Sequence, residues 1–352
     1  MAKPSFSDFG SVWKTIREVD VTAVRRESER AVSIVCVGDR EALRQIIHLL
    51  HEGPSRYAQE RSPLVPIPLD EVGPRSKVVA SADLLIVALD ITAQLTSAET
   101  FGLQALNDVA RPPRILVALG ETGQPLPPSI GRLGTRAFTF VDPRAAAAPE
   151  HLAEAVLKAL PDKLHLAAAR RLPGLRTLVA RRLTGEVSFS NATVAAASAL
   201  PSVFIVLGLP IAAADTLILT KNQALMVYRL ALAHGAPPDF QRRMIEITPV
   251  IGGAVLWRQV AGGLVGLIPG YGVLPKTAVA YAGTYITGRA AELWYQRGAV
   301  GKDDLRRIRA EGTEKAKDAS ARLMARARRA ARRGGAKEAG SAGRVTRREP
   351  RS

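Results

Sequence analysis

A charge-free stretch in the middle of the chain constrains its fold more than any other feature. From Ala192 to Ala214 there are 23 consecutive residues without a charged side chain. A helix of that length measures roughly 34 Å, which is enough to cross the apolar core of a bilayer. Pro201 and Pro210 interrupt the stretch, and each removes a backbone hydrogen-bond donor. We therefore expect a kinked helix or a re-entrant hairpin here rather than a straight spanning helix.

The continuation of this stretch carries a polar stripe. Asp215, Asn222 and Arg229 follow one another at intervals of seven residues, so they share one face of a helix. An apolar helix with a thin polar stripe usually packs in a bundle, where the stripe is hydrogen-bonded inside or faces a wet cavity. These three residues form the candidate polar stripe. An ion or proton path along them is the alternative, although further ionisable groups are missing.

A second apolar block runs over residues 247–288 and is rich in glycine. Gly262, Gly266 and Gly270 are spaced four residues apart, and this spacing lets helices approach closely in an apolar setting. We predict that these are helix-packing glycines in a hairpin of two helices. The spacing fits either a hairpin in a membrane or a bundle in water.

Strand and helix patterns alternate before these blocks. Strands are predicted at 31–37, 83–89, 114–119 and 136–141, and helices at 41–50, 97–109 and 149–160. Strands that are apolar throughout and separated by helices indicate a parallel, Rossmann-type sheet covered on both faces. Sheets of this type bind ligands at the carboxyl ends of their strands.

The order of these elements resembles a small GTPase, but the nucleotide-binding loops do not. A phosphate loop needs GxxxxGK[ST] after the first strand, whereas this chain has the run from Val37 to Glu41, with one glycine and two carboxylates. Guanine recognition in that family uses Asn-Lys-x-Asp, and the matching stretch from Leu119 to Thr122 lacks it. We also expect no DxxG turn between the first two strands. The pattern predicts a degenerate GTPase-like domain.

No other arrangement of reactive side chains stands out. His48 and His51 share a helix face with Glu52, but no further ligand completes a metal site. Cys36 lies in a predicted buried strand without an adjacent base. We therefore predict no catalytic residue, no cofactor and no metal, and a protein that is not an enzyme.

Basic residues are concentrated at the C-terminal end. Of the net charge of +17, residues 301–352 supply most, with 17 Lys and Arg against 7 Asp and Glu. A basic helix is expected over 303–333, with disorder beyond Gly334. Anionic headgroups of a phospholipid membrane are the expected partner. Nucleic acid is disfavoured because the tail has no aromatic residue to stack on bases, and a solvated tail without a specific partner is the remaining possibility.

Two further charged segments lie near the predicted domain boundaries. A basic stretch precedes the first apolar block, with its arginines at Arg170, Arg171, Arg176, Arg181 and Arg182. It suits the cytoplasmic face of a membrane, or a solvated helix face. Residues 5–30 read as an amphipathic helix, packed on the next domain or lying on a membrane surface. We expect no signal peptide here, because charged residues between Lys14 and Arg26 leave no apolar core segment.

Two motifs in the second half carry a resemblance to a known family. The first runs from Ala214 to Gln223 and continues with Tyr228–Ala231 and Gly235; the second is Ile268–Gly272, followed by Lys276, Ala280, Tyr281, Gly283, Thr284, Tyr285, Gly288, Ala290 and Ala291. Residues 163–298 with these motifs resemble the bacterial domain-of-unknown-function family six-nine-seven. The resemblance implies a helical, membrane-associated domain that often follows GTPase-like domains, and it implies no substrate or catalytic residue.

These observations predict four parts: an N-terminal amphipathic helix (1–30), a degenerate GTPase-like α/β domain (31–162), an apolar helical membrane-associated domain (163–298) and a basic, partly disordered tail (299–352). We expect an inner-membrane location with both termini in the cytoplasm. The expected function is a non-catalytic interaction or scaffold protein that binds a GTPase-like partner or a second copy. Two alternatives remain: an active GTP-binding switch with a non-standard loop around Gly38, and a soluble helical protein whose basic tail binds nucleic acid.

Overall fold

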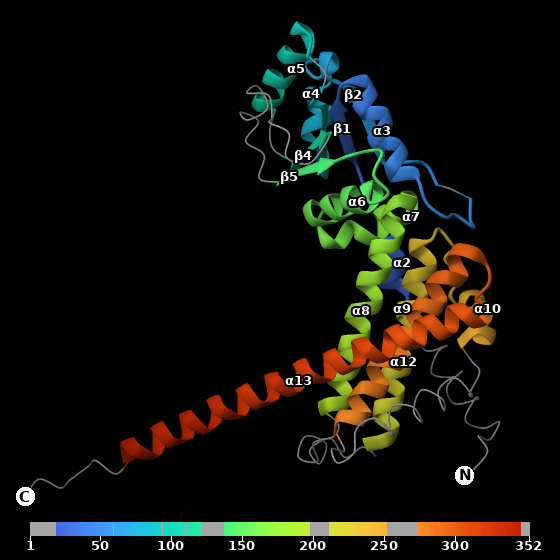
Figure 1. Cartoon of the computed structure of the whole chain (residues 1–352), viewed down its shortest axis with the longest axis vertical. Coiled ribbons are helices and arrows are strands. Elements are labelled where there is room, and N and C mark those ends of the chain that lie inside the picture. Colours follow the sequence, from blue (N-terminus) through green and yellow to red (C-terminus); the bar gives the residue numbers. More distant parts are fainter. Residues whose placement is uncertain are drawn as a thin grey trace, which may run out of the picture.

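A parallel sheet of five strands forms one end of the molecule, at the top of Figure 1. The computed structural model describes residues 19–58, 60–92, 94–109, 112–120, 137–197, 211–251 and 273–345. Its strands are β1 (Ile34–Gly38), β2 (Leu64–Pro68), β3 (Leu84–Asp90), β4 (Arg114–Leu119) and β5 (Ala137–Val141). They lie in the order β2-β1-β3-β4-β5, and all adjacent pairs are parallel. The predicted α/β class, with a parallel sheet between helices, is confirmed.

Strand β2 is an element that the hydrophobic pattern did not predict. It contains Pro66 and Pro68 and follows Pro63, and proline is uncommon in strands because it cannot donate to the ladder. The strand lies at the edge of the sheet, where one side of its backbone needs no partner. Tertiary pairing with β1 therefore overrides the unfavourable local sequence.

Alternate residues of the strands face two separate hydrophobic layers. Ile34, Cys36 and Ile86 face α3 (Arg40–His51) and α6 (Ala148–Ala159), whereas Val35 and Val87 face the opposite layer. That opposite layer includes η1 (Leu69–Glu71), α4 (Ser76–Ala80) and α5 (Ser97–Asp108). Both faces are covered, which explains why the central strands are apolar throughout.

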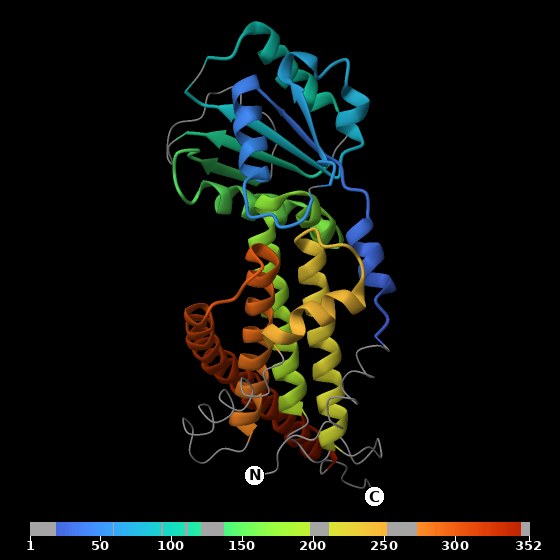
Figure 2. The same ribbon diagram turned by 90° about the vertical axis from the view of Figure 1, so that its right-hand side faces the viewer.

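The second half of the chain forms helices below the sheet, as Figure 2 shows. They are η2 (Asp162–Leu164), α7 (His165–Arg171), α8 (Pro173–Ala197), α9 (Ile211–Ala233), α10 (Phe240–Ile251), α12 (Val273–Arg297) and α13 (Lys302–Val345). Helices α8, α9 and α12 pack against one another, and α10 lies against α9 and α12. The short α2 (Thr22–Glu29) packs on α7 and α9.

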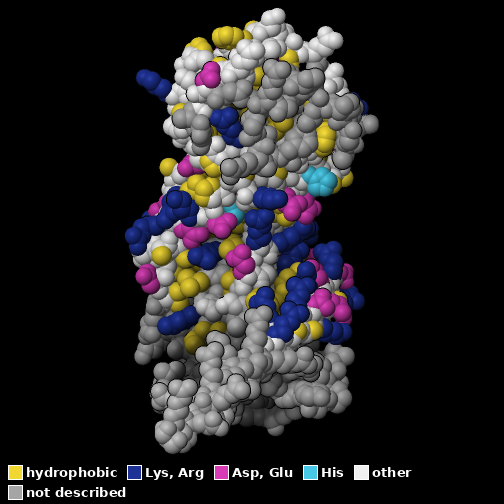
Figure 3. Space-filling model, turned by 90° about the vertical axis from the view of Figure 1, so that its left-hand side faces the viewer, with side chains coloured by type: hydrophobic (Ala, Val, Ile, Leu, Met, Phe, Trp, Pro, Cys, Tyr) yellow, Lys and Arg dark blue, Asp and Glu magenta, His cyan; other side chains and the backbone are white. Residues whose placement is uncertain are grey.

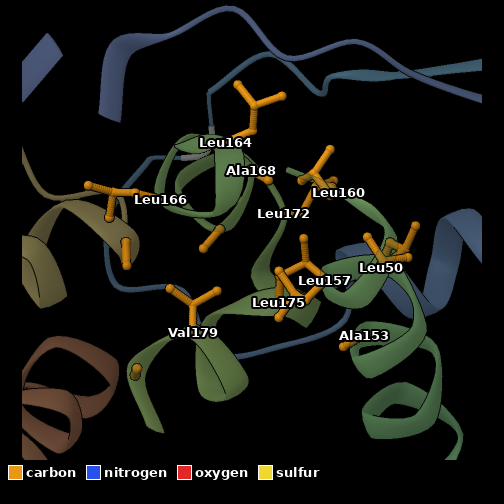
Figure 4. Packing of buried hydrophobic residues seen from close by; sticks show 14 of the residues in the cluster. Leu50, Ala153, Leu157, Leu160, Leu164, Leu166, Ala168, Leu172, Leu175 and Val179 are labelled. Atoms are coloured by element: carbon orange, nitrogen blue, oxygen red, sulfur yellow. The ribbon is translucent and has the colours of Figure 1, made fainter. Parts of the chain in front are cut away.

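The sheet domain and the helices share one hydrophobic core. Figure 4 shows Leu50 of α3 and Leu157 of α6 next to Leu175 of α8. The same cluster of buried residues continues from the sheet to Tyr228 in α9 and Tyr295 in α12. Because apolar burial is the main stabilising contribution, we expect the two halves to fold as one unit.

The predicted location in the inner membrane is wrong. Within the described ranges, no helix combines the length and the apolar character that crossing a bilayer requires. The long helices carry charged side chains in their interiors: Arg181 and Glu186 in α8, Lys221 and Arg229 in α9, and Arg289 and Glu292 in α12. Ionised groups in hydrocarbon are costly unless they are paired or reach the interface.

The basic tail forms a longer helix than the sequence pattern suggested. Helix α13 is 44 residues long, or roughly 66 Å at 1.5 Å per residue. It continues through Gly334 to Val345. Its first half packs on α12 and α8 through Ile308, Ala316 and Ala319, and the rest extends away from the body (Figure 1).

Candidate functional site

The carboxyl ends of β1 and β3 meet where the strand order reverses, which is the usual ligand-binding position in such sheets. Gly38, the last residue of β1, pairs in register with Ala88 of β3. A Cβ atom on Gly38 would lie 2.1 Å from the carbonyl oxygen of Ala88, so only glycine fits. This edge is where a nucleotide would bind if the domain held one.

A single residue, Asp39, connects β1 to α3. Its Oδ1 accepts a hydrogen bond of 2.8 Å from the backbone N–H of Ala42, which makes Asp39 the N-cap of α3. The unpaired N–H groups at a helix N-terminus are the groups that bind phosphate in nucleotide-binding folds. Here a carboxylate of the chain itself takes that position, and a connection of one residue has no room for a phosphate loop.

Further carboxylates line the same edge. Asp39 Oδ2 accepts a hydrogen bond of 3.0 Å from the backbone N–H of Asp90 at the end of β3. Asp90 in turn accepts hydrogen bonds from the N–H and hydroxyl of Thr92. Arg40 lies 3.5 Å from Asp70, with both side chains largely exposed. The carboxylate of Asp39 thus contacts the backbone of Asp90. The negative charges of these two side chains oppose the approach of a phosphate.

The turn after β2 corrects one expectation from the sequence. Asp70-Glu71-Val72-Gly73 begins two residues after Pro68, the end of β2, so a DxxG spacing does occur between two strands of the sheet. These four residues lie between the strands predicted at 31–37 and 83–89, so the expectation that no DxxG spacing occurs there is wrong on the sequence itself. The turn lies at the carboxyl edge, and the ion pair between Asp70 and Arg40 joins it to the first turn of α3.

A second group of polar side chains lies where the sheet domain meets the helices. We call it the arginine junction and define it by Arg170, Arg176 and Arg243, which are all buried. The sequence placed Arg170 and Arg176 on a face that meets lipid or water, and the structure instead places both inside the protein. Burial of an arginine is costly unless its N–H groups are bonded, so their partners explain the junction.

Arg176 binds backbone carbonyl groups from three directions. Its Nε and Nη2 donate to the carbonyl oxygens of Ala169 and Arg170, both at 3.1 Å, and Nη1 donates to that of Pro54 at 3.2 Å. Ala169 and Arg170 belong to the last turn of α7, whose carbonyl groups lack helical partners. Burial, and secondarily the charge of Arg170, lowers the pKa of Arg176 to about 10.

Arg170 likewise donates a hydrogen bond to a backbone carbonyl group, at the C-terminal end of α9. Its Nη1 donates to the carbonyl oxygen of Ala236 at 2.8 Å, and its Nε donates to Glu60 at 2.6 Å. Gly235, with φ of +83°, lies at this end of α9, where the N–H of Ala236 bonds to the carbonyl of Ala231. That pattern is the Schellman motif, which favours glycine.

The loop between α3 and β2, residues 52–63, supplies the other side of the junction. Besides Pro54 and Glu60, Tyr57 accepts a hydrogen bond of 3.1 Å from Arg243 of α10 through its hydroxyl. The guanidinium of Arg56 lies over the ring of Trp294, 5.1 Å from its centroid, close to the end of α12. One loop of the sheet domain therefore contacts the ends of α7, α10 and α12.

A buried histidine lies within this region. His234 is fully buried, its Nδ1 lies 2.8 Å from the carbonyl oxygen of Leu230, and its ring stacks on Tyr295. In the described part of the chain its Nε2 has no hydrogen-bond partner. Burial lowers the pKa of His234 to about 4, and the nearby Arg176 charge acts in the same direction. The ring is therefore neutral at physiological pH.

The predicted polar stripe on α9 divides between two environments. Asn222 donates a hydrogen bond of 2.8 Å to Asn191 of α8, which donates to Thr284 of α12 at 2.9 Å. This polar layer thus joins three helices inside the bundle. Arg229 instead forms an ion pair of 3.0 Å with Glu27 of α2. Asp215 belongs to α9, but its side chain lies outside the described residues, as do Gly262, Gly266 and Gly270.

The described side chains at both places hold segments of the chain together through hydrogen bonds and ion pairs. Burial raises the pKa of the Cys36 thiol to about 12, which makes it a poor nucleophile. Over the described ranges, no three or more of the His, Cys, Asp and Glu side chains are grouped as a metal site requires. The arginine junction was not predictable as a site, because its arginines find their partners in a loop more than 100 residues away.

Comparisons with known proteins add no neighbour: no protein-family model matches the chain, and neither a curated protein nor a solved structure does.

Proposed function

We propose that this protein is a non-catalytic, GTPase-like interaction or scaffold protein. The observation that carries the proposal is Asp39, whose carboxylate caps α3 at the position where a nucleotide-binding domain holds phosphate. Magnesium and phosphate need a loop there, and the chain has one residue between β1 and α3. In this proposal the sheet domain provides surfaces that bind other molecules.

Two features support the GTPase-like part of this proposal. The sheet is parallel, with the ligand-binding edge between β1 and β3, and a DxxG turn of Asp70 to Gly73 follows β2. The phosphate and guanine loops are the parts that differ. A domain that keeps its framework and loses its ligand loops retains surfaces for protein contacts, since function depends on the site rather than on the fold.

The arginine junction supports the scaffold part. The buried side chains of Arg176 and Arg170 join the loop at residues 52–63 to the ends of α7 and α9 with charge-assisted hydrogen bonds. Such bonds are stronger than neutral ones, and a common hydrophobic core accompanies them. Two rigidly joined halves hold their surfaces in a constant relative orientation, as a scaffold requires.

Nucleotide binding tests the proposal directly. Purified full-length protein is titrated with fluorescent GTP and GDP in the presence of magnesium, and with the same nucleotides by calorimetry. We expect no saturable binding at micromolar nucleotide. Saturable, magnesium-dependent binding would overturn the proposal and favour a switch that uses a non-standard loop at Gly38.

A matched variant separates the effect of the Asp39 charge on nucleotide binding from the effect of the short connection between β1 and α3. Asn caps helices as well as Asp, so Asp39→Asn removes the negative charge and keeps the cap of α3. We expect this variant also to bind no nucleotide, because the missing loop is the main obstacle. Nucleotide binding by Asp39→Asn would reveal an otherwise intact site and contradict a degenerate domain.

A further inference from the structure

The two halves of α13 differ sharply in charge. Residues 302–321 contain six basic and five acidic side chains, whereas residues 322–345 contain eight basic and one acidic. In the first half most of the charges are paired, for example Arg307 with Asp304 at 2.8 Å and Lys317 with Glu314 at 2.8 Å. We call residues 322–345 the distal segment.

The described arginines of the distal segment are exposed and lie on one side of the helix. Arg322, Arg326 and Arg329 follow one another at intervals of four and three residues, which places them on a single stripe. Within the described part of the chain none of the three has a carboxylate partner; Arg326 lies over the ring of Phe189, 5.4 Å from its centroid. Arg333 and Lys337 continue the same spacing in the sequence.

The distal segment also projects from the body. In Figure 1 it extends to the left, away from the other helices. Figure 3 shows that Lys and Arg side chains, with Asp and Glu among them, gather over the helical half of this face, while the sheet domain above has few. A rigid helix with unpaired positive charge along one side matches a rigid, extended negative partner.

We propose that the distal segment of α13 binds the phosphate backbone of double-stranded nucleic acid. Its 24 residues span roughly 36 Å, close to one turn of a duplex at about 34–36 Å. Seven of its eight basic residues are arginine, and the guanidinium group binds phosphate oxygens in pairs. This proposal is independent of whether the sheet domain binds a nucleotide.

The composition of the segment favours a duplex over the other polyanions. No aromatic residue follows Gln296, so stacking on the bases of a single strand is absent. Helices that lie in a lipid interface carry Trp, Phe or Leu opposite their charges; the distal segment contains one such residue, Leu323, and it packs against buried residues of the body. Phosphate contacts without base contacts give binding that does not depend on sequence.

Fluorescence anisotropy of labelled duplexes, titrated with the full-length chain at several salt concentrations, tests the proposal. We expect the logarithm of the affinity to fall linearly with the logarithm of the salt concentration. Two duplexes of unrelated sequence should bind equally. In the triple variant Arg322→Gln, Arg326→Gln, Arg329→Gln, the slope of log affinity against log salt concentration should become shallower by roughly 2.7, or about 0.9 for each phosphate contact removed.

The control substitutes arginines of the same helix that already have partners. Arg306 and Arg307 pair with Asp303 and Asp304, so Arg306→Gln with Arg307→Gln should leave the slope unchanged. Thermal unfolding verifies that each variant is folded. A triple variant with the wild-type affinity and slope overturns the proposal, and so does binding of the wild-type chain to phosphatidylglycerol vesicles without binding to duplexes.

Discussion

The guanidinium group of Arg176 lies 3.2 Å from the carbonyl oxygen of Pro54, although 122 residues separate them. Arg176 belongs to the first turns of α8, and Pro54 to the loop that leads from α3 to β2. The Arg176 side chain is buried, and its three hydrogen-bond acceptors are backbone carbonyl groups. Because carbonyl groups do not titrate, the contacts of Arg176 do not depend on a carboxylate remaining ionised, whereas the bond from Arg170 to Glu60 does.

Replacing Arg176 tests its contribution. In Arg176→Met, the carbonyl groups of Ala169, Arg170 and Pro54 lose a buried donor, and each unsatisfied buried group costs about 1–3 kcal/mol. We expect the free energy of unfolding to fall by about 3 kcal/mol, measured by guanidinium denaturation. Arg181→Met is the control, because Arg181 forms an ion pair with Glu150 in which both side chains are about half exposed; its loss should stay below about 1 kcal/mol. Equal effects would contradict this account.

The N-cap of α3 gives a second prediction. Asp39→Ala removes the acceptor for the N–H groups of Ala42 and Asp90, and we expect a loss of about 1–2 kcal/mol in the free energy of unfolding. Asp39→Ser keeps a capping oxygen and should recover most of that loss. Urea denaturation measures the free energy of unfolding of both variants. Equal stability of the two variants would show that the capping oxygen contributes nothing.

Two glycines near the contact between α8 and α12, Gly185 and Gly288, should affect stability in opposite directions when each is replaced by alanine. A Cβ atom on Gly288 of α12 would lie 2.6 Å from the Thr184 side chain of α8, whereas one on Gly185 would meet no atom within 4 Å. We expect Gly288→Ala to lower the free energy of unfolding by about 1–3 kcal/mol. Gly185→Ala should raise it by up to about 1 kcal/mol, because alanine is the better helix former. Thermal and urea unfolding report both, and a neutral Gly288→Ala would mean that the helices separate easily.

His234 should make stability depend on pH. Its pKa is about 4 in the folded protein, against 6.5 for an unperturbed histidine, so the unfolded chain binds a proton at higher pH than the folded one. The stabilisation is complete above about pH 6.5 and is lost as the pH falls towards about 4, by up to about 3 kcal/mol. Urea denaturation across this range should show the loss in the wild type and a shallower one in His234→Gln. Parallel curves would show that another group is responsible.

The strands of the sheet were predictable because each is encoded in a short, local pattern. The run predicted at 114–119 coincides with β4 (Arg114–Leu119), and the run at 83–89 differs from β3 by one residue at each end. In contrast, β2 contains prolines that a local pattern counts against a strand. Only pairing with β1 reveals it.

The helical half shows where a local pattern stops being informative. Periodicity and apolar composition indicated buried helices with a polar stripe, and Asn222 does hydrogen-bond inside the bundle. The same pattern was read as a membrane location, which is wrong for the described helices. Apolar side chains are covered equally well by lipid or by another helix, so a one-dimensional pattern does not distinguish the two.

The apolar strands and the helices between them could be predicted from the sequence, since they depend on neighbours along the chain; that one residue alone separates β1 from α3 became clear only in the structure. The tertiary structure decided that Arg170 and Arg176 are buried, that Arg229 pairs with Glu27, and that the ends of three helices meet one loop. Burying a charge becomes favourable only when carbonyl or carboxylate groups from distant segments arrive together, and no short stretch of sequence encodes which segments those are.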